Sequence, residues 1–319
     1  MNTWDLTTLG STMMSLTTEV GVPLPLGDKL RMDVAGAESN CAIALAGLGK
    51  RTCWLSKVGD TAVGDHVVSA IRAHGVDVSR VVRAAGRTEL MWVEAGLATN
   101  RTTVTYDRIG APMESLELSD VDLQAVQESA WFHFTGITPA LSASCRETLM
   151  AVVQHARSHG VKVSCDVNYR SKLWEPDEAQ AVLSPLMQGV DLLLVGRGDL
   201  QLLWQREGEG EREVKRLQEE YQIENVVLTE GAQGATGIFG DLVDQHGAFA
   251  GEVVSPIGAG DAFAAGVLSS LMNEESDLAL RRGCAMASLA RESRSDYVVG
   301  GLRALEAKLA EGEGKRLSR

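Results

Sequence analysis

The chain has 319 residues, of which 45% are hydrophobic, and its formal net charge is −13 at pH 7. This length and apolar content exclude an intrinsically disordered chain and allow one large domain with a buried core. The acidic balance argues against a surface that binds nucleic acid or an anionic membrane. An anionic small-molecule substrate would need a few cations placed locally around it.

The cysteines are scattered along the chain, and no CxxC pair occurs among them. They are Cys41, Cys53, Cys145, Cys165 and Cys284. This odd number without pairing predicts buried thiols in a reducing compartment, not a disulfide framework or a zinc site. No apolar run approaches the roughly 18 residues of a membrane span, and the first residues lack a cationic leader. We therefore expect a cytoplasmic protein.

Helix-like and strand-like segments alternate along most of the chain. Small and apolar residues with helical spacing fill 37–49 and 63–75, and both segments end in glycine, a helix-stop signal. Further helices are predicted over 142–159 and 211–221. Short β-branched or apolar runs predict strands at 51–59, 130–136, 161–168, 190–196 and 224–231. This alternation predicts an α/β fold with a mostly parallel sheet that helices cover on both faces.

Two segments depart from this alternation, namely 12–34 and 87–110. Both are rich in Thr and Val, alternate in polarity and lack an amphipathic pattern of helical length. They predict a small antiparallel sheet that projects from the main domain, with ordinary surface loops as the alternative. Since the sequence has no internal repeat, we expect one domain over 1–319 with this small sheet inserted in it.

The stretch "SPIGAGDAFAAG" (255–266) joins a glycine-rich loop to a run with helical character. Glycines allow a close approach to a ligand, and a helix N-terminus presents unpaired N–H groups with a partial positive charge. The loop therefore suits a phosphate group. Asp261 at its edge is suited to accept a proton from a hydroxyl nucleophile, as phosphoryl transfer requires. An aspartate that caps a buried helix is an equally good interpretation of these residues alone.

The motif "GAGDAFAAG" resembles the signature of the ribokinase-like (PfkB-type) carbohydrate kinases. The segment "DVAGAESNCAIALAGLG" (33–49) resembles the glycine-rich sugar-binding segment of that family, with Ala35-Gly36 in place of the usual glycine pair. The resemblance spans nearly the whole chain, and no Walker A motif supports a P-loop alternative. It implies a three-layer fold with the small sheet as a lid, and a kinase that uses ATP and Mg²⁺.

The resemblance also implies catalytic roles. Asp261 would be the base that deprotonates the acceptor hydroxyl. Gly258, Ala259 and Gly260 would form the anion hole that neutralises the transferring phosphoryl group.

The middle of the chain resembles one branch of the family. "FHFTGITPALS" (132–142) and "VSCDVNYRSKLW" (163–174) are similar to the 2-keto-3-deoxygluconate kinases, which phosphorylate a six-carbon keto acid at its terminal hydroxyl. Arginine forks suit the carboxylate of such a substrate. The resemblance implies substrate contacts from Gly36, Asn40, Tyr106, Arg108, Arg170, Asp261 and Asp296. The alternatives are a solvated charge for Arg108, a structural clamp for Arg170 and packing for Tyr106.

The segment "TEGAQGA" (229–235) resembles the strand and loop that line ATP in the family, with a simple glycine turn as the alternative. The implied nucleotide contacts are Asn168, Arg170, Thr229, Gly231, Gly234, Gly258 and Gly260. The family often organises magnesium through water with an Asn-x-x-Glu motif. The matching residues run from Gly196 to Asp199, so that Asp199 is the candidate in place of the acid and the Asn is absent.

Two departures from the family pattern leave the exact sugar open. Met91 stands where an aromatic residue is common, and Ser11 stands where an acidic residue usually follows the glycine. Both positions would face sugar hydroxyls, and a missing hydrogen-bond partner shifts the preference between sugars strongly.

The resulting hypothesis is an ATP-dependent kinase that converts 2-keto-3-deoxygluconate to 2-keto-3-deoxy-6-phosphogluconate and forms a homo-oligomer through the lid sheet. The alternatives are a kinase of a neutral sugar such as fructose or ribose, and a non-catalytic module that binds a sugar or nucleotide. A nucleoside kinase of the same fold is disfavoured, because only 5% of the residues are aromatic.

Overall fold

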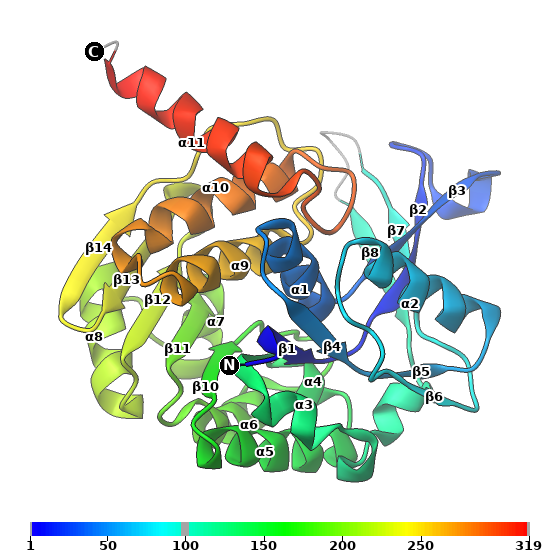
Figure 1. Ribbon diagram of the computed structural model, residues 1–319. Coiled ribbons are helices and arrows are strands. Elements are labelled where there is room, and N and C mark those ends of the chain that lie inside the picture. Colours follow the sequence, from blue (N-terminus) through cyan, green and yellow to red (C-terminus); the bar gives the residue numbers. More distant parts are fainter. Residues whose placement is uncertain (1, 97–101, 318–319) are drawn as a thin grey trace.

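An eight-stranded sheet forms the centre of the computed structural model, which describes residues 2–96 and 102–317 (Figure 1). Its strands follow the order β14-β13-β12-β11-β10-β9-β1-β4. Neighbouring strands are parallel from β4 to β12, and only β13 and β14 are added antiparallel at one edge. The strands are β1 (Trp4–Leu9), β4 (Thr52–Leu55), β9 (Ser129–Thr135), β10 (Lys162–Asp166), β11 (Leu192–Gly196), β12 (Asn225–Thr229), β13 (Ala235–Phe239) and β14 (Leu242–His246).

Helices cover both faces of this sheet and bury a separate apolar cluster on each. One face carries α1 (Ala37–Gly47), α9 (Ala259–Met272), α10 (Ala279–Arg291) and α11 (Gly301–Leu317). The other carries α3 (Leu123–Gln127), α5 (Ala143–Ser158), α6 (Pro176–Met187), α7 (Arg197–Trp204) and α8 (Gly210–Tyr221), with the short α4 (Ile137–Ala140) after β9. Single helical turns are η1 (Leu24–Leu26), η2 (Pro112–Ser115), η3 (Leu118–Asp120), η4 (Gly231–Gln233) and η5 (Ser276–Leu278). The predicted three-layer α/β fold is confirmed.

The small sheet projects from the main domain, as predicted, with strand order β3-β2-β7-β8 (Figure 1). Its strands are β2 (Met13–Thr18), β3 (Leu30–Ala35), β7 (Leu90–Glu94) and β8 (Thr103–Asp107), and residues 97–101 of the expected segment lie outside the described residues. The prediction of an antiparallel sheet is wrong for the central pair, because β2 and β7 are parallel. The reason is topological, since the chain returns to the main domain through α1 and β4 before it supplies the second hairpin.

The predicted strand at 51–59 is also divided in the structure. β4 ends at Leu55, and the chain continues as β5 (Lys57–Gly59), which pairs in parallel with β6 (Val82–Ala84) in a separate two-stranded sheet. The helix α2 (Ala62–Ala73) follows β5. The sequence "RTCWLSKVG" carries no glycine or proline at the break, so the change of sheet at Ser56 left no turn signal.

The described part of the chain bears on two further expectations. All five cysteines are buried and free, which confirms the prediction of buried thiols. Among the described residues, no helix combines the length and the apolar character needed to span a membrane.

The crossing of α9 and α10 depends on small residues. A Cβ atom added to Gly266 would lie 2.7 Å from the Arg282 carbonyl oxygen and 2.8 Å from the Gly283 Cα atom. Both neighbours are backbone atoms and have little freedom to move. The close approach of these helices matters for function, because α9 begins at the glycine-rich loop.

We expect Gly266→Ala to lower the free energy of unfolding by about 1–3 kcal/mol, because overpacking outweighs the higher helix propensity of alanine. Urea unfolding followed by circular dichroism measures this change. Gly198→Ala in α7 is the matched control, since nothing lies within 4 Å of its added Cβ atom. Equal midpoints for the two variants would show that the helix crossing tolerates a methyl group.

Candidate active site

The N-terminus of α9 is shaped by one glycine. Gly258 caps the helix with φ 79°, and a Cβ atom there would lie 1.8 Å from the Asp296 carbonyl oxygen. Only glycine combines this left-handed conformation with such a close approach. The first N–H groups of the helix, from Ala259 to Asp261, have no partner within the helix. These N–H groups are the ones that the predicted anion site would use, and the site itself stays a prediction.

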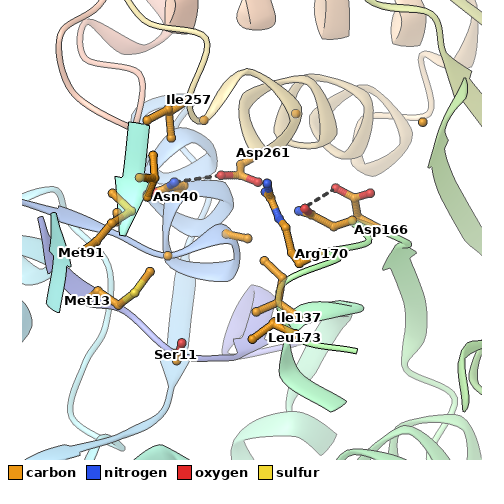
Figure 2. Close-up of a pocket in the computed structure, with 18 of the residues that line it drawn as sticks. Ser11, Met13, Asn40, Met91, Ile137, Asp166, Arg170, Leu173, Ile257 and Asp261 are labelled. Carbon is orange, nitrogen blue, oxygen red and sulfur yellow. Dashed lines mark hydrogen bonds between the residues drawn. The ribbon is translucent and has the colours of Figure 1, made fainter. Parts of the chain in front are cut away.

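Asp261 lies in the first turn of α9 and is 8% exposed. Its Oδ2 atom accepts a hydrogen bond of 2.8 Å from the Asn40 amide on α1 (Figure 2). Burial raises the pKa of Asp261, while the bond from Asn40 and the charge of Arg170 lower it. A carboxylate with a raised pKa, held in place by a neutral amide, is suited to act as a general base.

The helix that carries Asn40 is anchored by a buried acid. Glu38 accepts hydrogen bonds at Oε1 from the Thr135 backbone (3.2 Å) and from the hydroxyls of Thr135 (2.7 Å) and Thr138 (2.9 Å). Burial raises the pKa of Glu38 to about 7, although the threonine bonds lower it. These contacts join α1 to the end of β9 and to α4. They fix the position from which Asn40 reaches Asp261.

A second group of polar residues follows β10. Asn168 has φ 40°, and its amide donates to Asp166 Oδ2 at 3.4 Å. Burial, together with the charges of Asp261 and Asp199, raises the pKa of Asp166 to about 8. Figure 2 shows Arg170 extending from the loop after β10 toward Asp261, with Asp166 on the far side of it. One cation therefore faces several carboxylates at the carboxyl end of the sheet.

Asp199 stands in the first turn of α7, where its Oδ2 atom accepts a 3.2 Å hydrogen bond from the Tyr169 N–H. Burial raises its pKa, which Tyr169 and Arg170 lower. No cluster of three or more His, Cys, Asp or Glu side chains that could hold a metal ion is found in the described part of the chain. Magnesium normally takes one or two carboxylates and otherwise water and phosphate oxygens, so Asp199 and Asp166 fit such an ion.

The small sheet supplies the opposite wall. Arg108 is largely buried there, with Nη2 3.4 Å from the Met13 sulfur and its guanidinium 4.8 Å from the centroid of the Tyr106 ring. Its Nε and Nη1 atoms are buried and have no hydrogen-bond partner. Burial lowers the pKa of Arg108, while nearby Glu89 raises it. Lys172 donates to the Val104 carbonyl oxygen at 2.7 Å from the edge of the same wall.

These groups surround one cavity of about 440 Å³ between the main domain and the small sheet. Most of the residues predicted from the sequence line it, namely Gly36, Asn40, Tyr106, Arg108, Asn168, Arg170, Asp199, Thr229, Gly258, Gly260 and Asp261. Ser11 lies at its base, and Met13 and Met91 lie on its lid side (Figure 2). The cavity thus brings the two sequence motifs together.

Four predicted residues are not among those that line this cavity. Ala259, the first residue of α9, is partly buried against the apolar cluster beneath it. Gly231 and Gly234 belong to the turn after β12 and do not line the cavity. Asp296 lines a neighbouring cavity of about 570 Å³, and the two cavities share Ile257. Asp296 is 5% exposed, its Oδ2 atom has no hydrogen-bond partner, and burial raises its pKa to about 7.

Sequence reasoning missed several polar residues of the site. Asp166 and Lys172 flank the recognised Asn168 and Arg170 in "DVNYRSK", and their place at a strand end could have identified them. The buried acids Glu38 and Glu89 gave no local signal, because their partners are distant in the sequence.

Comparison with known proteins agrees with this geometry. Residues 5–298 match the model of the pfkB family carbohydrate kinases. The chain is 35% identical over 298 residues to a 2-dehydro-3-deoxygalactonokinase of Haloferax volcanii, covering 93% of this chain and 94% of that protein. It is 32% identical over 271 residues to a 2-dehydro-3-deoxygluconokinase of Bacillus subtilis, covering 82% of each.

A solved structure leads to the same family. The crystal structure of 2-dehydro-3-deoxygluconokinase from Thermotoga maritima superposes with a TM-score of 0.89 at 26% identity, covering 96% of this chain and 98% of that one. A cavity between a parallel sheet and a small sheet, with an aspartate at a glycine-rich helix start, is what an ATP-dependent sugar kinase requires. The chain belongs to the pfkB family and is a carbohydrate kinase.

Proposed function

We propose that the protein transfers the γ-phosphoryl group of ATP to the terminal hydroxyl of a 2-keto-3-deoxy sugar acid, with 2-keto-3-deoxygluconate as the first candidate. The observation that carries this proposal is Arg108, a buried guanidinium with two unpartnered donor atoms in the same cavity as Asp261. Buried donor atoms of a cation are costly when they have no acceptor, and a substrate carboxylate would supply one to Nε and Nη1. The names of the similar proteins, which are kinases of such acids, support the same substrate class.

In the proposed reaction Asp261 accepts the proton of the terminal hydroxyl. The resulting oxygen nucleophile bonds to the γ-phosphorus as the bond to the bridging oxygen breaks, and ADP leaves. The hydrogen bond from Asn40 engages Oδ2 and leaves Oδ1 for the substrate hydroxyl. The backbone N–H groups of Ala259, Gly260 and Asp261 stabilise the charge on the transferring group.

The nucleotide would lie toward the β11–β12 end of the cavity, where Thr229 and Asn168 line its wall. Gly231 and Gly234 would contact ATP only beyond this wall, in the turn after β12, where Gly231 is exposed and Gly234 is buried. Magnesium supplies charge neutralisation on the phosphates when bound with ATP, and Asp199 and Asp166 are the residues that would hold it through water.

The sugar acid would lie against the small sheet. Arg108 and Arg170 would bind its carboxylate end, while Tyr106, Gly36 and Asn40 would line the path to Asp261. A substrate contact from Asp296 stays a prediction, supported by its unpartnered Oδ2 atom behind Gly258. The small sheet would act as a lid over this end.

A second copy of this chain is the proposed partner of the lid. Leu16, Leu30, Met32 and Trp92 share the face of the small sheet that is turned away from the cavity, as the strand register requires. Met32 is 60% exposed there. The free thiols support the proposal of a cytoplasmic location.

Asp261→Asn is expected to lower kcat by about 10²–10⁴, because the general base is lost, with little change in ATP affinity. ADP release from MgATP with 2-keto-3-deoxygluconate measures kcat, and calorimetry measures ATP binding. The exposed Asp60→Asn serves as the control. Undiminished turnover in the Asp261 variant would rule out this mechanism and favour another base.

Arg108→Gln is expected to raise KM for the keto acid by about 30- to 150-fold, since charge-assisted hydrogen bonds worth roughly 2–3 kcal/mol are lost. The KM for ATP should change little. Arg87→Gln is the matched control, because Arg87 is exposed near the same sheet and pairs with Asp107. Wild-type preference for fructose or ribose, with an unaltered KM in the Arg108 variant, would instead identify a neutral-sugar kinase.

Met32→Glu is expected to convert the homo-oligomer to monomers, because a charge would be buried at the proposed contact. Size-exclusion chromatography with light scattering measures the mass. Leu202→Glu provides the control, because Leu202 on α7 is also an exposed apolar residue but lies outside the small sheet. A wild-type monomer at micromolar concentration contradicts the proposed interface.

A further inference from the structure

Glu89 occupies a defined place at the base of the small sheet. The pairing of Leu90 with Met14 on one side and Asp107 on the other puts Glu89 in register between Met13 and Arg108. The Met14 N–H donates to the Glu89 carbonyl oxygen at 3.0 Å. Side chains alternate along a strand, so Glu89 shares the cavity-facing side with Met91, two residues further on. Only 1% of Glu89 is exposed.

Two cavity-lining residues interact with this carboxylate. Hydrogen bonding from the Ser11 side chain and the positive charge of Arg108 both lower the pKa of Glu89. The guanidinium of Arg108 reaches across the Glu89 position in the sheet to the Met13 sulfur. It makes no direct hydrogen bond to Glu89 through Nε or Nη1, which are both unpartnered. A buried acid therefore lies beside the substrate-facing cation without satisfying its donors.

The surroundings of Glu89 favour its neutral form. The charged and titratable groups that act on it are Arg108, Glu114 and Cys145. Burial raises the pKa of Glu89 to about 7 and Glu114 raises it further, while Arg108 and Ser11 lower it. The carboxyl is thus mostly protonated below this pH and mostly ionised above it.

We propose that Glu89 is a specificity-determining residue that sets the net charge of the acid-binding end of the cavity. When Glu89 is neutral, Arg108 presents its full positive charge to a substrate carboxylate. When Glu89 is ionised, it offsets that charge and repels the carboxylate, so the sugar acid binds more weakly. The inference rests on the proposed function, because it assigns the carboxylate of the substrate to Arg108.

The experiment measures binding of 2-keto-3-deoxygluconate by calorimetry without ATP at pH values from 5.5 to 8.5. The Kd of the wild type should rise by about fivefold between pH 6 and pH 8, as expected for two charges at moderate separation in a partly buried site. Glu89→Gln removes the ionisable group and should bind tightly with a flatter pH profile. The difference between the two pH profiles of Kd gives the effect of Glu89 ionisation, separate from that of the other carboxyls of the cavity.

Two more variants sharpen the test. Ser11→Ala removes a hydrogen bond that lowers the pKa of Glu89, so the rise in Kd should move to higher pH. Asp107→Asn is the matched control, because Asp107 adjoins Arg108 in sequence but its carboxylate is half-exposed and pairs with Arg87. Its profile should follow that of the wild type.

The outcomes separate the role of Glu89 from the proposed function. A profile in Glu89→Gln as steep as that of the wild type overturns the role of Glu89, as does weak binding of this variant at every pH in a correctly folded protein. If Glu89→Gln does not fold, an unshifted profile in Ser11→Ala overturns it. A wild type that neither binds nor phosphorylates any keto acid overturns the proposed function itself, before any variant is compared.

Discussion

One hydrogen bond joins the two halves of the site. Asn40 and Asp261 are 221 residues apart in sequence, and their contact brings the N-terminus of α1 against the N-terminus of α9. A buried carboxylate needs a donor to stay in a fixed orientation, and a neutral amide provides one without forming an ion pair that would hold the base ionised. The anchoring of α1 through Glu38 and the close contact behind Gly258 both serve to keep these two helix ends in register.

Much of the fold was predictable because its signals are local. Helices that end in glycine and short apolar strands predicted the three layers, and the glycine-rich loop predicted a helix start with Asp261 in its first turn. The pairing of β2 with β7 was not predictable in the same way, because it depends on the route of the chain through the main domain. The division of the strand near Ser56 was missed for a similar reason, since no glycine or proline marks the break and the second half pairs with the distant β6.

The predictions for the site also succeeded in placing residues at the cavity where the signal is local and failed where it depends on distant residues. Residues within strong motifs, such as Gly258 and Arg170, line the cavity, whereas Asp296, from the short match "SRSD", lines the neighbouring one. The buried acids were invisible to local patterns. Ser11 was interpreted as the loss of an acidic group, yet Glu89, just before β7, is close enough for Ser11 to lower its pKa, so a neighbouring segment supplies a carboxyl to the same region.

The construction of the small sheet from two separate hairpins limits how it can move. Four chain connections link this sheet to the main domain, at the start of β2, the end of β3, the start of β7 and the end of β8. A flap on a single hairpin has two such connections and bends at one hinge. With four, any closing motion has to be a rigid rotation that all the crossings share, so loosening one of them leaves three to guide the sheet.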